Sequence, residues 1–541
     1  MRPEGGEPVL RITGLTIALP PNADRRHAVE DVSFSVAAGE IVCIVGESGS
    51  GKSVTAFSIM RLLSRGLRSV SGTVAFGGED LLRKSERAMR RLRGNRLAMI
   101  FQEPATALSP TMTVGRQIEE PFRVHTAMGK GERRTRALQL MTLVNLPEPG
   151  HLIGRYPHEL SGGQRQRVMI AMALALEPAL LIADEPTTAL DVTTQAQIIA
   201  LIRSLQRRSN AGVLFVTHDL SLVSEIADRV VVMQQGKLVE EGRAADVLAN
   251  PRHPYTQALL AAIPGLSHRR RTRQPPGANL LQVERLSKTY TSGGLFRTTR
   301  TITAVRDVSL NVRRGETVAL VGESGSGKST VARCIAGLVQ LTSGRIVVGS
   351  TNDEKRSDEV QIVFQDPNRS LDPRWTVGRS LVEGLRNRGI GRTDARKRAG
   401  RLLERVGIPP EAMTRYPHQF SGGQRQRICI ARALTLDPTL LIADEAVSAL
   451  DVSVQAQVLT LLQDLQHDLE IGMLFITHDL RVAAQISDRI AVMQRGVIME
   501  EGGAVQLIAA PQHPYTKLLF DSAFGLGGAV SATEATIIPD T

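Results

Sequence analysis

Two glycine-rich segments of the chain carry the residue types that bind phosphate. Residues 46–53 read Gly-Glu-Ser-Gly-Ser-Gly-Lys-Ser, and the same eight residues recur at 322–329. Both match the P-loop pattern Gly-x-x-x-x-Gly-Lys-Ser. The glycines let successive backbone N–H groups converge on phosphate oxygens, the lysine reaches the outer phosphates, and the serine hydroxyl is a ligand for Mg²⁺. We predict one nucleotide site at Gly46, Glu47, Ser48, Gly49, Ser50, Gly51, Lys52 and Ser53, and another at Gly322, Glu323, Ser324, Gly325, Ser326, Gly327, Lys328, Ser329 and Thr330.

A pair of adjacent carboxylates follows an apolar segment in each half of the chain. Leu-Leu-Ile-Ala precedes Asp184-Glu185 and again Asp444-Glu445. An aspartate suits Mg²⁺, which needs few protein ligands because it keeps waters and substrate phosphates. The neighbouring glutamate can orient or deprotonate an attacking water. The pair therefore predicts hydrolysis of the bound nucleotide in both halves.

A Ser-Gly-Gly-Gln segment followed by Arg-Gln-Arg is a second phosphate-binding device in each half. It combines a hydroxyl, bare backbone and the start of a predicted helix. A P-loop needs no such partner in its own copy, so the duplication suggests that the two copies face each other and that each completes the other's nucleotide site. The residues are Ser161, Gly162, Gly163 and Gln164 in the first copy and Ser421, Gly422, Gly423 and Gln424 in the second.

Short apolar segments precede these motifs and must position them. Their length and continuous apolar character are typical of buried parallel strands in an α/β sheet. The polar residues follow directly after them, which is where ligands bind in open α/β sheets. The predicted strands are 41–45, 180–183 and 213–217 in the first copy and 317–321, 440–443 and 473–477 in the second.

The whole chain is two copies of one module. The P-loops are offset by 276 residues, whereas every shared motif from Arg155 onward is offset by 260, so the second copy lacks sixteen residues between these points. Residues 266–279 are polar, arginine-rich and contain two prolines, which is typical of an exposed linker. We predict a first domain at 1–265, a linker at 266–279 and a second domain at 280–541.

Composition excludes several classes of protein. Of 541 residues, 42% are hydrophobic and 22% charged, as in ordinary globular proteins. No window approaches the roughly 18 apolar residues of a transmembrane helix, and the N-terminus resembles no signal peptide, so we expect a cytoplasmic protein. Cys43, Cys334 and Cys429 are far apart, which favours core positions over disulfide, zinc or iron–sulfur sites. The net charge of +12 favours anionic partners, while 3% aromatic residues argue against stacking on single-stranded nucleic acid.

Taken together, the ordered motifs resemble those of an ABC-type ATPase, twice over and across nearly the whole chain. Besides the segments above, they include Phe-Gln at 101–102 and 364–365 and Thr-His-Asp at 217–219 and 477–479. The resemblance implies an α/β fold with two tandem P-loop ABC-type ATPase domains. Each would have a RecA-like α/β core, an antiparallel β subdomain and a helical subdomain that carries the Ser-Gly-Gly-Gln signature.

The resemblance also implies roles for single residues. Gln102 and Gln365 would be Q-loop glutamines that sense Mg²⁺ and the membrane partner. Asp191 and Asp451 would be D-loop aspartates, and His218 and His478 would be switch histidines near the γ-phosphate. The set predicted to carry catalysis is Glu185, Glu445, His218 and His478, and the set predicted to bind Mg²⁺ is Ser53, Gln102, Asp184, Ser329, Gln365 and Asp444.

Each copy ends in a His-Pro-Tyr-Thr segment, at 253–256 and 513–516. This element is similar to the C-terminal extension of importers for oligopeptides, dipeptides, glutathione and nickel. The resemblance implies an ATP-hydrolysing subunit that energises import of peptides or related small solutes. It would be a peripheral protein on the cytoplasmic face of the inner membrane, with two permease subunits, an extracytoplasmic binding protein and an anionic membrane surface as partners. ATP and Mg²⁺ are the expected cofactors, and neither an iron–sulfur cluster nor nucleic acid is expected.

The two copies differ where the family stacks the adenine on an aromatic residue. The second copy has Tyr290, whereas the first has Leu19, so the first site should hold ATP more weakly. Both Glu185 and Glu445 are present, although Pro186 in the first copy corresponds to Ala446 in the second. Both sites are therefore expected to hydrolyse ATP.

Two other functions compete with import. Tandem ABC proteins without membrane partners act on ribosomes or damaged DNA, but the ribosomal type has a long charged linker and the repair type has zinc-binding cysteines, and this chain has neither. A nucleotide-binding scaffold without hydrolysis would not need intact Glu185, Glu445, His218 and His478. The transported solute is left open, because its selection belongs to partners.

Overall fold

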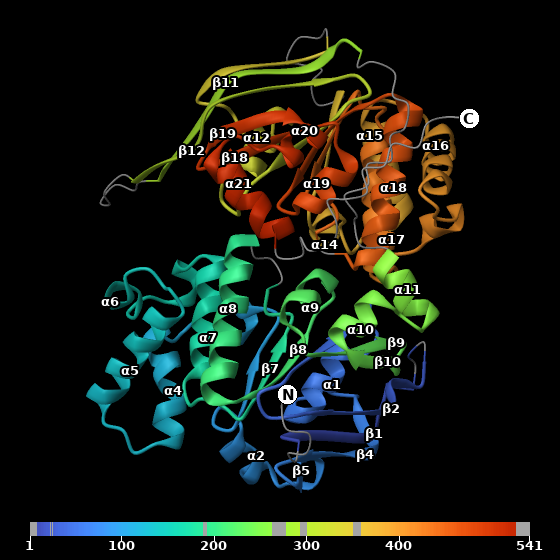
Figure 1. Ribbon diagram of the computed structural model, residues 1–541. Helices are drawn as coiled ribbons and strands as arrows, with labels where there is room; N and C mark the ends of the chain where they lie inside the picture. The colour runs from blue at the N-terminus through green and yellow to red at the C-terminus, as the bar shows by residue number, and fades with distance from the viewer. Residues whose placement is uncertain are drawn as a thin grey trace. The chain divides into compact units, whose positions relative to one another are not determined.

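The computed structural model describes residues 8–525 except 22, 24, 188–191, 262–276, 293–299, 350–358 and 449. These residues form two compact units, one for each copy of the module (Figure 1). The predicted linker lies outside the described residues except for 277–279, and Asn279 already begins a strand.

A six-stranded sheet forms the centre of the first unit, in the order β10-β9-β3-β8-β7-β6. Its strands are parallel except for β10 at the edge. The predicted strands at 41–45, 180–183 and 213–217 are confirmed. The strands are β3 (Ile41–Val45), β6 (Leu97–Ile100), β7 (Leu180–Asp184), β8 (Gly212–Val216), β9 (Arg229–Gln234) and β10 (Lys237–Arg243).

Both faces of this sheet are covered, which explains the continuous apolar segments. In β3, Cys43 and Val45 belong to one hydrophobic cluster, while Val42 and Ile44 belong to the cluster on the other face. The second cluster also contains the antiparallel sheet β2-β1-β4-β5 and helix α1. These elements are β1 (Leu10–Ala18), β2 (His27–Val36), β4 (Arg68–Phe76), β5 (Glu79–Asp80) and α1 (Lys52–Met60).

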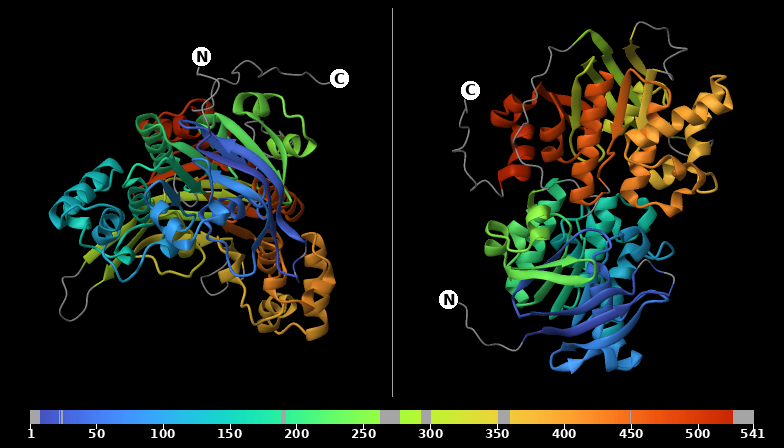
Figure 2. Two further views of the ribbon diagram at one scale, coloured as in Figure 1. Left: turned by 90° about the horizontal axis from the view of Figure 1, so that it is seen from below. Right: turned by 90° about the vertical axis from the view of Figure 1, so that its right-hand side faces the viewer.

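Helices form the rest of the first unit. Those between the Phe-Gln and Ser-Gly-Gly-Gln motifs project to one side of the unit (cyan in Figure 2), as expected for a helical subdomain. The helices are α2 (Glu86–Leu92), α3 (Pro104–Ala107), α4 (Val114–His125), α5 (Lys130–Leu143), α6 (Pro149–Leu152), α7 (Gly162–Leu174), α8 (Val192–Ser209), α9 (Leu220–Ile226), α10 (Ala244–Ala249) and α11 (Pro254–Ala261).

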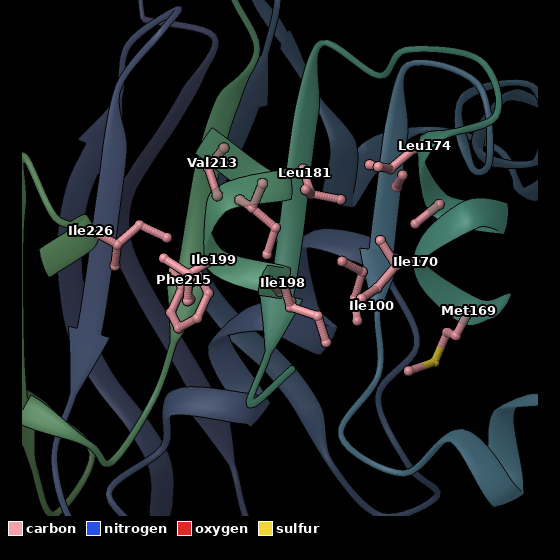
Figure 3. Close-up of a cluster of buried hydrophobic side chains, with 14 of the residues drawn as sticks. Ile100, Met169, Ile170, Leu174, Leu181, Ile198, Ile199, Val213, Phe215 and Ile226 are labelled. Atoms are coloured by element: carbon pink, nitrogen blue, oxygen red, sulfur yellow. The ribbon is translucent and has the colours of Figure 1, made fainter. Parts of the chain in front are cut away.

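Helices α7, α8 and α9 pack on one face of the six-stranded sheet through a buried cluster (Figure 3). Strands β6, β7 and β8 supply the other side of this contact. Burial of several large apolar side chains fixes where α7 begins relative to the strand ends. The residues labelled in the figure are Ile100, Met169, Ile170, Leu174, Leu181, Ile198, Ile199, Val213, Phe215 and Ile226.

The second unit repeats this architecture. Its central sheet has the order β15-β16-β17-β13-β18-β19, and a second, antiparallel sheet has the order β12-β11-β14. The predicted strands at 317–321, 440–443 and 473–477 are confirmed. The strands are β11 (Asn279–Ser292), β12 (Arg300–Arg313), β13 (Thr317–Val321), β14 (Ser343–Val348), β15 (Val360–Val363), β16 (Leu440–Asp444), β17 (Gly472–Thr477), β18 (Arg489–Gln494) and β19 (Val497–Gly503).

The helices of the second unit follow the same order as those of the first. They are α12 (Lys328–Ile335), α14 (Pro367–Ser370), α15 (Val377–Asn387), α16 (Arg392–Arg405), α17 (Gly422–Leu434), α18 (Val452–Leu469), α19 (Leu480–Ile486), α20 (Ala504–Ala509) and α21 (Pro514–Phe520). The three cysteines are buried, as predicted. In the part of the chain that the structure describes, no helix is long and apolar enough to cross a membrane.

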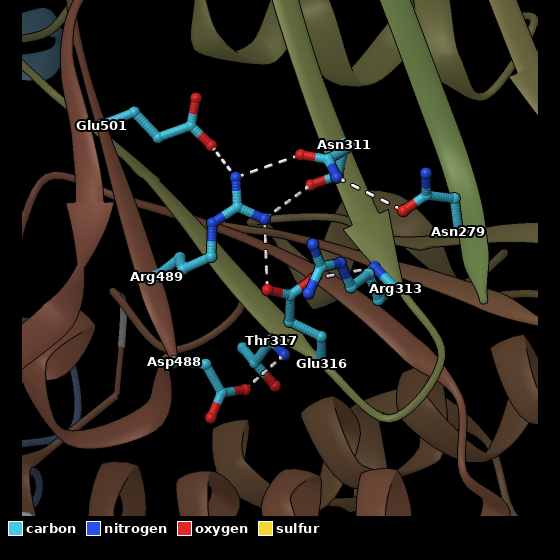
Figure 4. Close-up of polar contacts among 8 residues, drawn as sticks. All are labelled: Asn279, Asn311, Arg313, Glu316, Thr317, Asp488, Arg489 and Glu501. Carbon is cyan, nitrogen blue, oxygen red and sulfur yellow. Dashed lines mark hydrogen bonds and ion pairs between the residues drawn. The ribbon is translucent and has the colours of Figure 1, made fainter. Parts of the chain in front are cut away.

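An arginine network ties the two sheets of the second unit together (Figure 4). The Arg489 guanidinium on β18 donates to the Glu316 carboxylate at 3.1 Å, to the Asn311 side-chain oxygen on β12 at 3.1 Å, and to Glu501 on β19. Glu316 is almost fully buried and also accepts from the backbone N–H of Arg313 at 2.8 Å. The network therefore holds strands from both sheets around one buried carboxylate.

Candidate active site

The first P-loop connects β3 to α1 in a shape that requires glycine. Gly46 has a φ of 147°, and a Cβ there would lie 2.1 Å from the Met233 carbonyl oxygen. Gly51 precedes α1 with a φ of 100°. The buried Lys52 donates its Nζ to the Gly46 carbonyl at 2.7 Å and to the Glu47 carbonyl at 2.9 Å. The loop thus surrounds a cation at the N-terminus of a helix, an arrangement suited to phosphate.

Ser53 and Asp184 meet although they are 131 positions apart in the chain. The Ser53 Oγ, in the first turn of α1, donates to the Asp184 Oδ1 at the carboxyl end of β7 at 2.9 Å. A hydroxyl and a carboxylate are oxygen ligands that Mg²⁺ accepts. Among the described residues no group of three or more His, Cys, Asp or Glu side chains has the arrangement of a metal site. These two oxygens therefore fit a Mg²⁺ ion that takes its remaining ligands from water and nucleotide phosphates.

Glu185 is held from two sides. Gln102 donates its Nε2 to one carboxylate oxygen at 2.8 Å, and the His218 Nδ1 lies 3.2 Å from the other. Glu185 has a φ of 46°, a left-handed conformation that is unfavourable for a glutamate and typical of functional sites. Its backbone N–H donates to the Val216 carbonyl at 2.9 Å, which fixes this turn at the end of β7. These contacts orient the Glu185 carboxylate.

The protonation of these groups follows from burial and from their neighbours. Burial raises the pKa of Asp184 to about 6, although the hydrogen bond from Ser53 acts in the opposite direction. Burial favours neutral His218, but the Glu185 carboxylate outweighs it, so the pKa of His218 lies above its ordinary value. In the second copy, burial raises the pKa of Glu445, but His478 outweighs it and the pKa is lowered overall. Glu445 is therefore stabilised as an anion, the form that a general base needs.

The second copy contains the same contacts at the corresponding residues. Lys328 donates its Nζ to the Gly322 carbonyl at 2.7 Å and to the Glu323 carbonyl at 2.8 Å. Glu445 has a φ of 49°. The remaining contacts are Ser329 Oγ to Asp444 Oδ1 at 3.0 Å, Gln365 Nε2 to Glu445 Oε2 at 2.7 Å and His478 Nδ1 to Glu445 Oε1 at 3.5 Å.

The signature motifs form exposed helix starts, as predicted. The Ser161 hydroxyl accepts from the Gln164 N–H at 3.2 Å, and the Gln164 side chain accepts from the Ser161 N–H at 3.0 Å. Ser421 and Gln424 cap α17 in the same way. Asp451 precedes α18, whereas Asp191 lies outside the described residues.

The two adenine positions differ in structure as well as in sequence. Tyr290 lies near the end of β11 with 41% of its surface exposed, and the Lys288 ammonium is 5.1 Å from its ring centroid. Leu19, which follows β1, is partly buried against the hydrophobic cluster of its unit. The exposed Tyr290 ring can stack on a base, whereas the Leu19 side chain packs partly against the hydrophobic cluster.

Two contacts of the first P-loop were not predicted. The Tyr255 hydroxyl, from the His-Pro-Tyr-Thr segment, accepts from the Glu47 N–H at 3.0 Å. Arg25 donates to the Gly49 carbonyl from the turn between β1 and β2. The recurrence of the His-Pro-Tyr-Thr segment in both copies was the sequence signal that could have identified Tyr255. No pattern marked Arg25, because Thr301 stands at the corresponding place in the second copy.

Comparisons with known proteins identify the family of the chain. The family model described as ABC transporter matches residues 29–188 and 305–448. The chain belongs to the ABC transporter family. A second model, described as the C-terminal region of oligopeptide/dipeptide transporters, matches residues 239–305 and 499–537. The predicted class of the family and its tandem α/β fold are thereby confirmed.

Curated relatives extend the match to nearly the full length of the chain. The glutathione import ATP-binding protein GsiA of Salmonella paratyphi A is 48% identical over 94% of this chain and 89% of the relative, and GsiA of Escherichia coli has the same values. Among solved structures, the post-hydrolysis dimer of the ATP-binding cassette MJ0796 has 30% identity and a TM-score of 0.40, covering 43% of this chain and 98% of that chain. The chain with the two duplicated sites is an ABC transporter subunit, an ATPase that binds ATP and energises transport, as predicted. The ribosomal and DNA-repair alternatives are not supported.

The difference between Tyr290 and Leu19 predicts unequal nucleotide affinity in this ABC ATPase. Tyr290→Leu, tested in a chain whose first site is disabled by Lys52→Ala, should weaken ATP binding at the second site by about 1–3 kcal/mol. The reverse change, Leu19→Tyr with Lys328→Ala, should strengthen the first site. Equilibrium titration with a fluorescent ATP analogue measures both. Equal affinities of the two unmodified sites would contradict this explanation.

Proposed function

We propose that the chain is the ATP-hydrolysing subunit of an importer for glutathione or short peptides. The observation that carries this proposal is that both copies hold the complete set of lysine, serine, aspartate, glutamate, glutamine and histidine contacts. Both copies also carry the oligopeptide/dipeptide extension, and the relatives named above are glutathione import proteins. A chain with a degenerate site would be expected to lack some of these contacts in one copy.

In each copy the residues divide the work of hydrolysis. Lys52 and Lys328 stabilise negative charge on the outer phosphates. Ser53 and Asp184, or Ser329 and Asp444, would hold Mg²⁺, with Gln102 or Gln365 as a further predicted ligand, and the ion would supply additional charge neutralisation.

We assign the activation of the attacking water to Glu185 and Glu445. Each carboxylate accepts a hydrogen bond from its Q-loop glutamine and lies beside its histidine. These contacts orient the carboxylate so that it can position the water and accept its proton. Because the resemblance implies that His218 and His478 lie near the γ-phosphate, we assign them to stabilising its charge.

The signature motifs complete the sites in trans. Each motif presents a serine hydroxyl and the exposed N-terminus of a long helix, which favours an anion. We assign Ser161–Gln164 to the ATP held by the second P-loop and Ser421–Gln424 to the ATP held by the first. ATP binding then closes the two copies on each other, and hydrolysis releases them.

The partners follow from the class of transporter. Two permease subunits would dock on the helical subdomains that contain α3–α6 and α14–α16, and an extracytoplasmic binding protein would deliver the solute. The chain would then lie at the cytoplasmic face of the inner membrane, where its net charge of +12 suits anionic lipid.

A trapped complex tests this proposal. Tagged chain carrying Glu185→Gln and Glu445→Gln is mixed with Mg-ATP and detergent-solubilised host membranes, and bound proteins are identified by mass spectrometry. Recovery of two polytopic membrane proteins with a binding protein supports import, and uptake of glutathione or peptide by vesicles containing them defines the cargo. The matched control is Lys52→Ala with Lys328→Ala, which should show no ATP-dependent recovery. Recovery of ribosomes or repair proteins without a permease would overturn the proposal.

A further inference from the structure

The His-Pro-Tyr-Thr segment of the first copy has no part in the chemistry above, yet it is firmly built into its unit. The two oxygens of Glu240, on the edge strand β10, accept from the backbone N–H groups of Arg252 at 2.8 Å and His253 at 3.1 Å. The His253 Nδ1 then accepts from the Tyr255 N–H at 3.2 Å and caps α11. Three hydrogen bonds therefore fix the position from which Tyr255 extends.

Tyr255 reaches the P-loop from 208 positions away in the chain. Its hydroxyl accepts from the Glu47 N–H at 3.0 Å, and its ring packs against the hydrophobic cluster that contains Val45, the last residue before the loop. A partly buried backbone N–H needs an acceptor, and in this loop the tail supplies it. The phenol is long enough to combine packing with this hydrogen bond.

The Gly46–Glu47 peptide, whose N–H donates to Tyr255, also contacts the P-loop lysine through its carbonyl. This carbonyl, that of Gly46, accepts from Lys52 Nζ at 2.7 Å. A phosphate that recruits Lys52 draws this donor away from the carbonyl. In a trans peptide the N–H points away from the carbonyl, so the hydrogen bond from Glu47 to Tyr255 lies on the opposite side of the peptide from Lys52. The tyrosine contact therefore restrains the loop independently of the lysine contact.

We propose that Tyr255 is a positioning residue for the first nucleotide site: it holds the Glu47 peptide so that the following backbone N–H groups converge on the phosphates. The tail thereby sets the ATP affinity of its own copy. This inference rests on the ATP binding shown for the family and is independent of the cargo proposed above.

The second copy contains the same construction. Glu500 accepts from the N–H groups of Gln512 at 2.8 Å and His513 at 3.0 Å, and the His513 Nδ1 accepts from the Tyr515 N–H at 3.1 Å. Tyr515 is buried in a cluster with Val321, the residue before the second P-loop.

Tyr255→Phe in the full-length chain tests the proposal, because phenylalanine keeps the ring and removes only the hydroxyl. Lys328→Ala is added so that nucleotide binding reports on the first site. Titration with a fluorescent ATP analogue should show a roughly threefold to tenfold loss of affinity, the value of one neutral hydrogen bond. Hydrogen exchange should become faster in peptides covering 46–53 and stay unchanged in α7. Tyr156→Phe, at an exposed tyrosine stacked on His158, is the control and should change neither.

Glu240→Gln provides a second variant, since it weakens the anchor of the tail without touching Tyr255. It should lower the affinity in the same direction and by less. Unchanged affinity in a folded Tyr255→Phe chain would overturn the proposal. A lower unfolding temperature with faster exchange throughout β3 would also overturn it, because Tyr255 would then serve stability alone.

Discussion

Replacing both Glu185 and Glu445 by glutamine should lower the steady-state ATPase rate by roughly 10²- to 10⁴-fold. Glutamine keeps an oxygen for Gln102 or Gln365, but it cannot accept a proton from the attacking water. The P-loops, Ser53 and Ser329 are unchanged, so ATP should bind with nearly its original affinity. Phosphate release measures the rate, and titration with a fluorescent ATP analogue measures binding.

A matched control exists for this experiment. Glu177 and Glu470 are exposed glutamates with the same left-handed backbone, each in an ion pair far from catalysis. Glu177→Gln with Glu470→Gln should leave the ATPase rate within a factor of about two, because exposed ion pairs contribute little. The single variants Glu185→Gln and Glu445→Gln then show how much of the ATPase rate each copy contributes. Loss of ATP binding in the active-site double variant, or an unchanged rate, would contradict the assigned role.

Arg489→Met should destabilise the second unit by about 3 kcal/mol. Methionine retains the packing of the arginine stem but leaves the carboxylate of Glu316, which is 3% exposed, without its cation. Arg489 is 26% exposed, so water compensates in part and the effect should lie at the lower end of the range for buried ion pairs. Calorimetry on the full chain should show the transition of one unit lowered by roughly 6–12 °C.

An exposed ion pair of the same unit is the control. Arg405 and Asp468 are 3.0 Å apart with exposed side-chain fractions of 39% and 54%. Arg405→Met should therefore change the stability by less than about 1 kcal/mol. Equal shifts for the two variants would mean that Glu316 does not depend on Arg489. Glu316→Gln combined with Arg489→Met should recover part of the loss, because no buried charge remains.

The sequence by itself determined the parts of this protein whose signals are local. A strand buried on both faces must be apolar at every position, so Ile41–Val45 and its counterparts were predicted to within about one residue. A loop with the φ of Gly46 requires glycine, and α7 needs a capping residue, which is Ser161. The residue types of both motifs therefore indicate their backbone conformation. Because every motif occurs twice, the domain type and the family were predictable from the sequence.

Only the tertiary structure decided which distant groups meet. Ser53 and Asp184 are in contact because β3, β8 and β7 are neighbours in the sheet, an order that no local pattern encodes. The contact of Tyr255 with Glu47 and that of Arg489 with Glu316 likewise join residues more than 170 positions apart. A hydrogen bond depends on a few tenths of an ångström between such groups. The residue types that form it are also common elsewhere, so its partners become identifiable only when packing of the core has set the distance.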